Sequence, residues 1–121
     1  MWQSHIGAAQ PMLTDELKKG TTPLLILALL ETQPRHGYEL SKLLDERSGG
    51  VVHVHAASLY PLLYRLEQDG LIEGRWVEKA GHRRRRYYQI TADGKRQLRA
   101  QRREWKDFVR AIGQLTGVEY A

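Results

Sequence analysis

The chain has 121 residues, of which 41% are hydrophobic and 27% charged, and it carries a formal net charge of +5 without a single cysteine. This length and composition fit one small folded domain and disfavour a two-domain enzyme or a disordered chain. The absence of cysteine excludes disulfides, thiolate zinc sites and cysteine nucleophiles. The longest apolar run, Leu24 to Leu30, is seven residues long, whereas a membrane-spanning helix needs ~20, so we expect a cytoplasmic protein.

The first third of the chain predicts an arm followed by helices. Residues 1–11 show no hydrophobic period, and we expect a flexible N-terminal arm there. A short helix is predicted from Leu13 to Lys19 and closed by Gly20. One of the two threonines that follow then caps a second helix, whose apolar run makes it central to the core.

Two amphipathic helices are predicted next. The first opens at His36-Gly37, places Leu40 and Leu44 on one stripe and stops at a glycine pair. The second begins at Ser58, whose hydroxyl is suited to cap it, and ends at Gly70. The leucines of this second helix follow the i, i+3, i+4, i+7 rule, which predicts that its back is buried.

The hydrophobic period then changes from helical to extended. Residues Leu71 to Glu78 and Arg84 to Ile90 predict a β-hairpin with Gly81 in its turn. Trp76 is predicted to belong to the core of this hairpin.

A long C-terminal helix is predicted to follow Thr91, a capping residue, and to run from Ala92 to Thr116. Six of its residues are spaced 3, 4, 3, 4 and 3 apart, as in a coiled-coil seam: Leu98, Gln101, Trp105, Phe108, Ile112 and Leu115. A helix of ~37 Å, at 1.5 Å per residue, cannot lie wholly on so small a body. We therefore predict that residues 92–121 form a dimerisation helix, with Gln101 as a polar knob and the other five residues in contact with a second copy.

Positive charge is concentrated in one part of the chain. Residues 79–110 contain twelve Lys or Arg against three acidic residues, a net charge of +9, while the remainder has seven basic and eleven acidic residues, a net charge of −4. Polyphosphate is the usual partner of such a patch, because each neutralised phosphate releases a condensed counterion. A solvated helix face is the alternative, and charge alone leaves both open.

Three motifs lie in order along these predicted elements: His36-Gly37-Tyr38-Glu39-Leu40, then Ser58 to Ile72 (SLYPLLYRLEQDGLI), then Arg84-Arg85-Arg86-Tyr87-Tyr88 with Ile90-Thr91-Ala92-Asp93-Gly94. The order of helices, hairpin and long helix is that of a winged helix-turn-helix domain followed by a dimerisation helix. From about Leu13 to Trp105 the chain closely resembles PadR-type transcriptional regulators. It looks like their short branch, which lacks a large C-terminal domain.

The resemblance implies a mainly α fold with a β-hairpin wing, a winged helix-turn-helix DNA-binding domain over residues 12–91 and a C-terminal dimerisation helix. It also implies a homodimeric, sequence-specific repressor of transcription that binds an inverted-repeat operator in double-stranded DNA. The helix that begins at Ser58, the third of the winged domain, would lie in the major groove, and the wing would lie on the neighbouring groove.

The helix predicted to begin at Ser58 carries side chains suited to DNA on the side opposite its leucines. Tyr60 and Tyr64 lie one turn apart, their hydroxyls and that of Ser58 donate well to phosphate oxygens, and Arg65 can reach base edges. We predict that Tyr60 contacts DNA. For Tyr64 the alternative is packing under the wing, and for Arg65 it is an ion pair within the domain.

The preceding helix contributes two further candidates. The resemblance implies that Tyr38 contacts the sugar-phosphate backbone, and Lys42, one turn later, is a candidate phosphate ligand. His36, at the start of this helix, is interpreted as a helix cap rather than a titrating switch.

The run Arg83 to Arg86 is the strongest electrostatic feature of the sequence. Side chains of a strand alternate between its faces, so four consecutive arginines cannot all point one way. Arg86 shares the side of Tyr88 and needs a partner there. We predict that Lys79, His82, Arg83 and Arg84 contact DNA and that Arg85 and Arg86 are at least partly structural.

Neither a metal site nor a catalytic site is predicted. His53 and His55 alternate in an extended segment without a third ligand, which favours packing or surface placement. The serines lack a His and Asp pattern, and no Gly-rich phosphate loop follows a strand. We expect no enzymatic activity and no cofactor.

Trp105 lies at the centre of the seam. Some PadR-like proteins use an aromatic residue here to line a pocket between subunits, which implies a small aromatic effector that releases the repressor; a space-filling interface anchor is the alternative. Two other function classes stay open: a protein-interaction module whose basic surface binds an acidic partner, and a non-specific nucleoid or RNA-binding protein.

Overall fold

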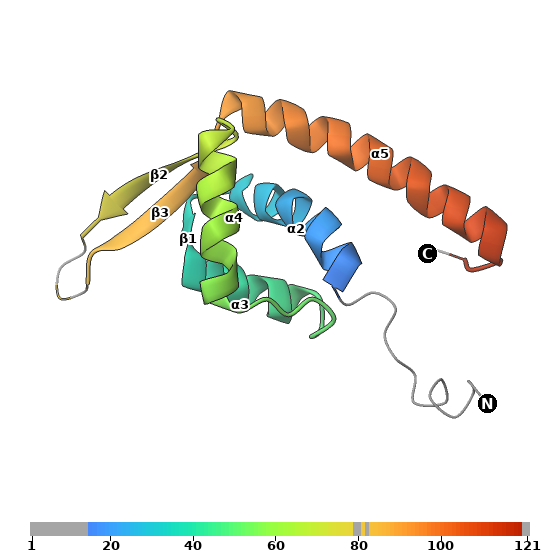
Figure 1. The fold of residues 1–121 in the computed structure, drawn as a ribbon, viewed down its shortest axis with the longest axis horizontal. Coiled ribbons are helices and arrows are strands. Elements are labelled where there is room, and N and C mark those ends of the chain that lie inside the picture. The colour runs from blue at the N-terminus through green and yellow to red at the C-terminus, as the bar shows by residue number, and fades with distance from the viewer. Residues whose placement is uncertain (1–14, 79–80, 82, 120–121) are drawn as a thin grey trace.

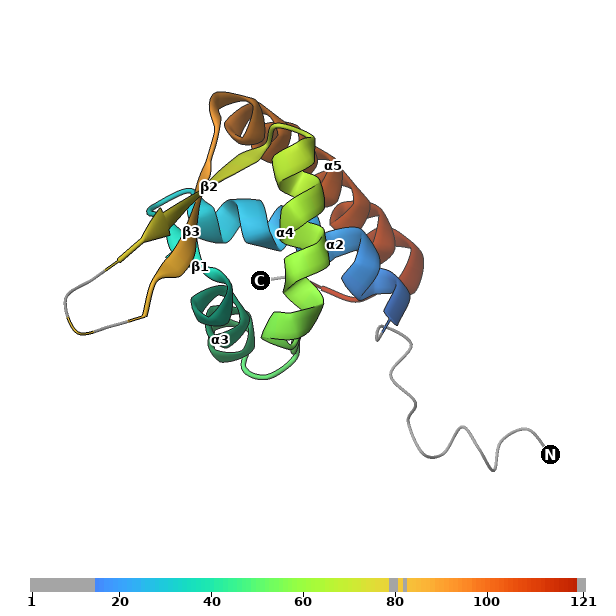
Figure 2. The same cartoon turned by 60° about the vertical axis from the view of Figure 1, so that its left-hand side comes forward.

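The computed structural model describes residues 15–78, 81 and 83–119. Its elements are, in chain order, α2 (Asp15–Leu30), β1 (Arg35–His36), α3 (Gly37–Arg47), α4 (Ala56–Gln68), β2 (Ile72–Val77), β3 (Arg85–Ile90) and α5 (Ala92–Thr116). Helices α2, α3 and α4 pack together, the β2–β3 hairpin projects from one side of them, and α5 runs along α2 and past its end (Figures 1 and 2). The predicted fold class, mainly helical with a hairpin wing, is confirmed.

Helix α2 is continuous and contains both Gly20 and Pro23, so the predicted break at Gly20 is wrong. Glycine and proline both weaken a helix interior. Here Ile26, Leu27 and Leu30 are buried in the core, and packing of this apolar end stabilises the helix more than the local propensities weaken it. The predicted arm over residues 1–11 lies outside the described residues. Of the helices described, none has the length and apolar character needed to cross a membrane.

Two different caps begin α3 and α4. His36 has extended backbone, and its Nδ1 accepts the backbone N–H of Glu39 at 3.2 Å, which is the predicted cap of α3. Helix α4 begins at Ala56, two residues before Ser58, so the predicted Ser58 cap is wrong. The extended residue His55 is the cap, and its carbonyl oxygen accepts the N–H of Ser58 at 2.9 Å.

The sheet has the strand order β1-β3-β2 and is antiparallel. The hairpin register pairs Ile72 with Ile90 at its base and Val77 with Arg85 toward its tip. Gly81, in the intervening turn, has φ of +76°, the left-handed conformation that glycine adopts readily. Strand β1 contains two residues only, too few for a periodicity, and sequence reasoning missed it.

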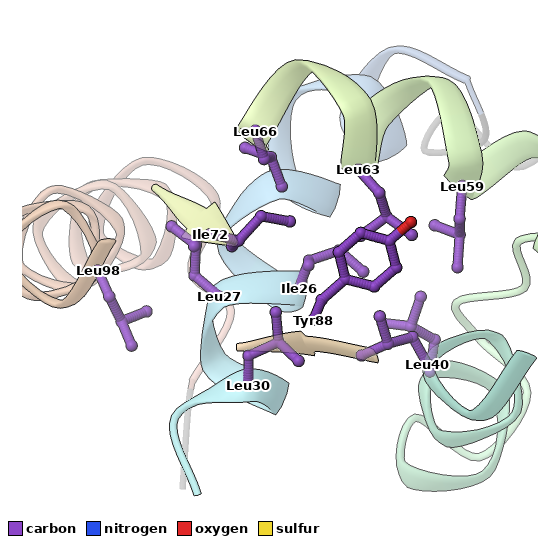
Figure 3. Packing of buried hydrophobic residues seen from close by; sticks show 11 residues of the cluster. Ile26, Leu27, Leu30, Leu40, Leu59, Leu63, Leu66, Ile72, Tyr88 and Leu98 are labelled. Atoms are coloured by element: carbon purple, nitrogen blue, oxygen red, sulfur yellow. The ribbon is translucent and has the colours of Figure 1, made fainter. Parts of the chain in front are cut away.

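The core lies where α2, α3, α4, the hairpin and the first turns of α5 meet (Figure 3). Its buried apolar residues are Ile26, Leu27, Leu30, Leu40, Leu44, Leu59, Leu63, Leu66, Ile72, Tyr88 and Leu98. Leu98 is therefore part of the domain's own core, because it packs inward from α5, and it drops out of the predicted dimer seam.

The start of α5 is held tightly against the end of α4 and the start of β2. Thr91 Oγ1 accepts the N–H of Gly94 at 3.0 Å, which confirms the predicted cap, and it donates to the carbonyl oxygen of Gly70 at 2.6 Å. A Cβ atom on Gly94 would overlap the carbonyl oxygen of Leu71. The direction in which α5 leaves the domain is therefore set by close backbone packing.

Candidate nucleic-acid interface

Three tyrosines stand exposed on α3 and α4. Tyr38, Tyr60 and Tyr64 are 64%, 49% and 66% exposed, although large rings usually bury most of their surface. Tyr60 and Tyr64 lie one turn apart on the side of α4 away from its buried leucines, and Tyr38 lies in the first turn of α3. Tyr64 therefore does not pack under the wing, and three phenolic donors are accessible to a partner.

Gly37 lets α4 come close to the start of α3. A Cβ atom at this position would lie 2.9 Å from Tyr60 Cε1 and 3.2 Å from the Tyr60 hydroxyl oxygen. Only a glycine leaves room for the ring without a shift. The Tyr60 ring and the helix start that carries Tyr38 are thus neighbours, although the two tyrosines come from different helices.

His36 connects the start of α3 to the wing. Beside its capping contact through Nδ1, its Nε2 lies 3.0 Å from Arg85 Nη1. The imidazole ring packs edge-on against Tyr87, with 5.2 Å between ring centroids, and is stacked with Tyr38 at 6.5 Å. These contacts fix the base of the wing relative to α3, and they agree with the predicted structural part of the role of Arg85.

Arg86 is anchored to α4. Its Nη2 donates to Glu67 Oε2 at 2.6 Å, and the same carboxylate oxygen accepts the N–H of Gly74 at 3.3 Å. A Cβ atom on Gly74 would lie 2.6 Å from Arg86 Nε, so the glycine makes room for the guanidinium. Burial raises the pKa of the neighbouring Tyr88 phenol, and the charge of Arg86 acts in the opposite direction. The prediction that Arg86 needs a partner is confirmed, and that partner links the wing to α4.

Trp76 is 56% exposed, so its predicted place in a hairpin core is wrong. It lies on the same face of β2 as buried Ile72 but nearer the tip of the hairpin, which projects beyond α4 (Figure 1). The guanidinium carbons of Arg84 and Arg86 lie 5.0 and 5.6 Å from its ring centroid, within the range of cation–π contacts. The ring therefore supports Arg84 on an exposed face of the wing.

The other predicted contact residues that the structure describes are exposed on α4, on the wing and on α3. Ser58 and Arg65 are exposed on α4, and Arg83 is exposed beside Arg84 on the wing. Among the described residues no acid lies within ion-pair distance of Arg65. Lys42 is exposed on α3 and forms an ion pair with Glu46 at 3.9 Å. Lys79 and His82 lie outside the described residues.

The two histidines between α3 and α4 lie beside each other, and His53 also lies beside an acid of α3. His53 Nδ1 lies 3.3 Å from Asp45 Oδ1, and its ring packs edge-on against His55 with 4.9 Å between centroids. Within residues 15–78, 81 and 83–119, no three potential ligands gather at one point.

Helix α5 carries a second exposed surface, which is apolar. Trp105 and Phe108 lie with their ring centroids 5.6 Å apart, and both line a shallow hollow. Gln101 lines the same hollow, and its Oε1 is buried without a hydrogen-bond partner among the described residues. Ile112 is half-buried and Leu115 is exposed farther along the helix.

Sequence reasoning missed the residues that position the wing. Glu67 is the one acidic residue of α4, but its position on the helix does not reveal its partner, and the signal in the sequence was Gly74. A glycine inside a strand often marks a close approach of another group, and here that group is the Arg86 side chain held by Glu67.

Comparison with known proteins identifies the family of this chain. The model of the transcriptional regulator PadR-like family matches residues 26–100. Uncharacterized protein X from Lysinibacillus sphaericus is 30% identical over 96 residues, covering 79% of this chain and 88% of that protein. A solved structure of a PadR family transcriptional regulator from Eggerthella lenta has 31% identity and a TM-score of 0.77, covering 98% of this chain and 97% of that chain.

A further solved structure is that of Bacillus subtilis PadR in complex with operator DNA. It has 25% identity and a TM-score of 0.60, over 65% of this chain and 45% of that chain. The winged domain, the three motifs and these matches lead to one conclusion: the chain belongs to the PadR-like family of transcriptional regulators.

Proposed function

We propose that this chain is a homodimeric repressor that binds an inverted repeat in double-stranded DNA, with one winged domain on each half-site. The observation that carries the proposal is that the exposed tyrosines and the exposed wing arginines belong to one braced surface. Glu67 joins α4 to Arg86, and His36 joins α3 to Arg85. Hydrogen-bond donors on α3, α4 and the wing are thereby held at fixed distances from one another, as recognition of the regularly spaced phosphates of a DNA backbone requires. The operator complex of the Bacillus subtilis relative supports duplex DNA as the partner.

The proposed contacts are of two kinds: contacts to phosphates, which position the protein on the DNA, and contacts to bases, which select the sequence. Donors at the helix starts and on the wing place the protein by phosphate contacts: Tyr38, Lys42, Ser58, Tyr60, Lys79, His82, Arg83 and Arg84. Arg65 and Tyr64 lie farther along α4, which enters the major groove, and they select the site through base edges.

The dimer is proposed to form through α5. Trp105, Phe108, Ile112 and Leu115 continue the apolar seam after Leu98 has turned into the core. An exposed apolar seam of this kind favours self-association about a two-fold axis, because the same surface serves both copies. The proposed symmetry of the protein then matches that of an inverted repeat.

A small aromatic ligand is the proposed effector that releases the repressor. The supporting observation is the hollow beside Trp105 and Phe108, in which the buried Oε1 of Gln101 is an acceptor with no hydrogen-bond donor among the residues that the structure describes. A flat ligand with one hydrogen-bond donor fits this combination of ring faces and a single polar atom. Quenching of tryptophan fluorescence by planar aromatics is expected in the wild type and not in Trp105→Leu; equal quenching in both would place the ligand elsewhere.

Selection of bound fragments from random duplex DNA tests the proposed function. We expect a palindromic consensus whose half-sites lie about one helical turn apart. Enrichment without a consensus would favour a nucleoid or RNA-binding protein. Absence of duplex binding would favour an acidic protein partner.

The dependence of affinity on salt tests the phosphate contacts. Changing Arg83 and Arg84 together to alanine should lower the slope of log affinity against log salt by roughly 1.8, since each lost phosphate contact contributes ~0.9. Arg99→Ala with Arg103→Ala on α5 removes the same charge from an exposed site away from the wing, and it should leave the slope near its wild-type value.

A further inference from the structure

Helix α5 carries a row of exposed cations along one side. The members of this basic row lie 3, 4, 3 and 4 positions apart, and all five are exposed: Arg96, Arg99, Arg103, Lys106 and Arg110. Each of them lies two residues before Leu98 or before a residue of the apolar seam that follows it, and two residues turn a helix by about 200°. The basic row therefore occupies the side of α5 opposite the seam, over a length of ~21 Å at 1.5 Å per residue.

Acidic side chains pair with the two end members of the basic row. Arg96 forms an ion pair with Asp93, and Arg110 Nη1 lies 3.7 Å from Asp107 Oδ1. Within the part of the chain that the structure describes, no acid lies within ion-pair distance of the three middle members, Arg99, Arg103 and Lys106. Like charges one helical turn apart repel each other. An anion supplied by another molecule would therefore stabilise the middle of the row.

The basic row lies on the far side of the domain from the exposed tyrosines. Helix α2 lies between α5 and α3, and α3 carries Tyr38 (Figures 1 and 2). Leu98 points from α5 into the core (Figure 3), so the opposite side of this helix faces away from α2. A duplex bound by the tyrosines and the wing would not cover the row, and a dimer formed through the seam would leave both rows exposed.

The composition of this side of α5 fits a phosphate backbone better than a protein surface. Apart from the five cations it holds Ala92, Ala100, Asp107 and Gln114. Protein interfaces are built around buried aromatic and large apolar anchors, and this side has none. Four of the five cations are arginines, whose guanidinium groups donate two parallel hydrogen bonds to phosphate oxygens. A row of evenly spaced cations also gains from the release of counterions by a nucleic acid.

We infer that the basic row binds the phosphate backbone of a second segment of duplex DNA, without regard to its sequence, while the winged domains hold the operator. This inference goes beyond the proposed function, on which the operator and the dimer rest, because it adds a contact on the opposite side of the domain. The twelve Lys or Arg of residues 79–110 would then serve two DNA-binding surfaces, the wing and the outer side of α5.

A capture experiment tests the basic row in the full-length protein. The protein is bound to an immobilised operator duplex no longer than the two half-sites, free protein is washed away, and a fluorescent duplex of unrelated sequence is added at about 50 mM salt. The wild type should capture this second duplex. Arg99→Gln with Arg103→Gln should lower the affinity for it about 100-fold, since each lost phosphate contact contributes roughly tenfold at this salt. Operator affinity should stay unchanged.

Two control variants accompany the row variant. Arg99→Lys with Arg103→Lys keeps both charges and should retain most of the capture. Arg47→Gln with Arg102→Gln removes two charges from exposed positions off the row and should capture as the wild type does. If the wild type captures no second duplex, or the row variant captures as much as the wild type, the inference is wrong. Capture of poly-glutamate in place of the duplex would overturn it in favour of an acidic protein partner.

A measurement on the free protein separates this inference from the proposed function. In nitrogen-15 spectra the side-chain Nε–H signals of Arg99 and Arg103 should shift when a duplex of unrelated sequence is added, and added salt should reverse the shift. The same shift is expected when Arg83 and Arg84 are both changed to alanine, because the row acts independently of the wing. Unshifted signals contradict the basic row. A failure to select palindromic DNA contradicts the operator instead and does not alter this readout.

Discussion

The wing and α5 both leave the compact body of the domain, and they are stabilised in opposite ways. The wing is polar, and contacts within the same chain brace it: Arg86 with Glu67, and Arg85 beside His36. Beyond Leu98, α5 is apolar along one side, and within the described part of the chain one ion pair joins it to the body, between Arg102 and Glu31. A charged projection can be fixed by pairing inside one domain, whereas an exposed apolar seam lacks such pairing and favours contact with a second chain, as in the proposed dimer.

The largest expected effect concerns α5. Changing Phe108 and Ile112 together to aspartate should weaken the proposed dimer by ~100-fold or more, because carboxylates in an apolar interface lose their hydration. Sedimentation at micromolar concentration measures this change, and circular dichroism should show that the domain is still folded. Arg103 is exposed and lies off the seam, so the Arg103→Asp variant should still form the proposed dimer. An unchanged dimer in the double variant would mean that another surface joins the copies.

The second largest effect concerns the close packing of Gly94 at the start of α5 and is a loss of stability. Gly94→Ala forces a methyl group against the carbonyl oxygen of Leu71, and we expect a loss of about 3 kcal/mol in the free energy of unfolding, at the upper end for overpacking. Gly20→Ala is the control, since it is exposed in α2 with open space around it, and it should gain about 0.5–1 kcal/mol. Urea denaturation compares the two. If both variants change the free energy of unfolding by a similar small amount, the backbone around Gly94 can shift to accommodate a methyl group.

The third effect concerns the contact between Glu67 and Arg86 that links the wing to α4. Glu67→Gln leaves a weaker acceptor for Arg86, and we expect operator affinity to fall about tenfold with the salt slope unchanged, since no phosphate contact is removed. Hydrogen exchange of the Gly74 amide, which donates to the same carboxylate, should become faster. Glu73→Gln on the other face of β2 should change neither quantity. A reduced salt slope in Glu67→Gln would indicate that the wing is misplaced rather than loosened.

The aromatic support on the wing gives a smaller effect. Trp76→Leu removes the ring beneath Arg84 and should lower operator affinity roughly threefold, as expected for an exposed cation–π contact. Trp76→Phe keeps a ring and should retain most of the affinity. If the two variants bind alike, the ring does not order Arg84.

The smallest effect is a pH dependence at the ion pair between α5 and the end of α2. The hydrogen bond from Arg102 holds the pKa of the Glu31 carboxyl below its ordinary value of 4.5, so the ionised form stabilises the fold. This contribution is present above pH 4.5 and is lost as the pH falls through the lowered pKa. Glu31→Gln should therefore show a flatter loss of stability in acid, measured by thermal unfolding between pH 6 and pH 3. An unchanged acid profile would show that the exposed pair contributes nothing.

Local signals predicted much of this fold. The capping roles of His36 and Thr91, the two hairpin strands and the span of α5 follow from short-range chemistry, and the structure places them as expected. The exposure of Tyr60 and Tyr64 was likewise predictable, because the leucine stripe of α4 assigns them to its other side.

What the sequence could not predict depends on contacts between distant residues. The continuity of α2 through Gly20, the exposure of Trp76 and the burial of Leu98 each depend on which element covers a given face. The partner of Arg86 was predicted only as a requirement, since Glu67 lies 19 residues away in the chain. No periodicity carries that information.

The close packing at the start of α5 has a consequence for how the two copies of the proposed dimer would read DNA together. Because Gly94 and Thr91 hold the direction of α5, the rotational angle between α4 and the proposed dimer seam would depend on the number of residues between Leu98 and Trp105. Inserting one residue there turns the seam by about 100° relative to α4. Operator spacing would then be encoded in helix length, so that relatives differing by single insertions in this segment would read half-sites in a different rotational setting.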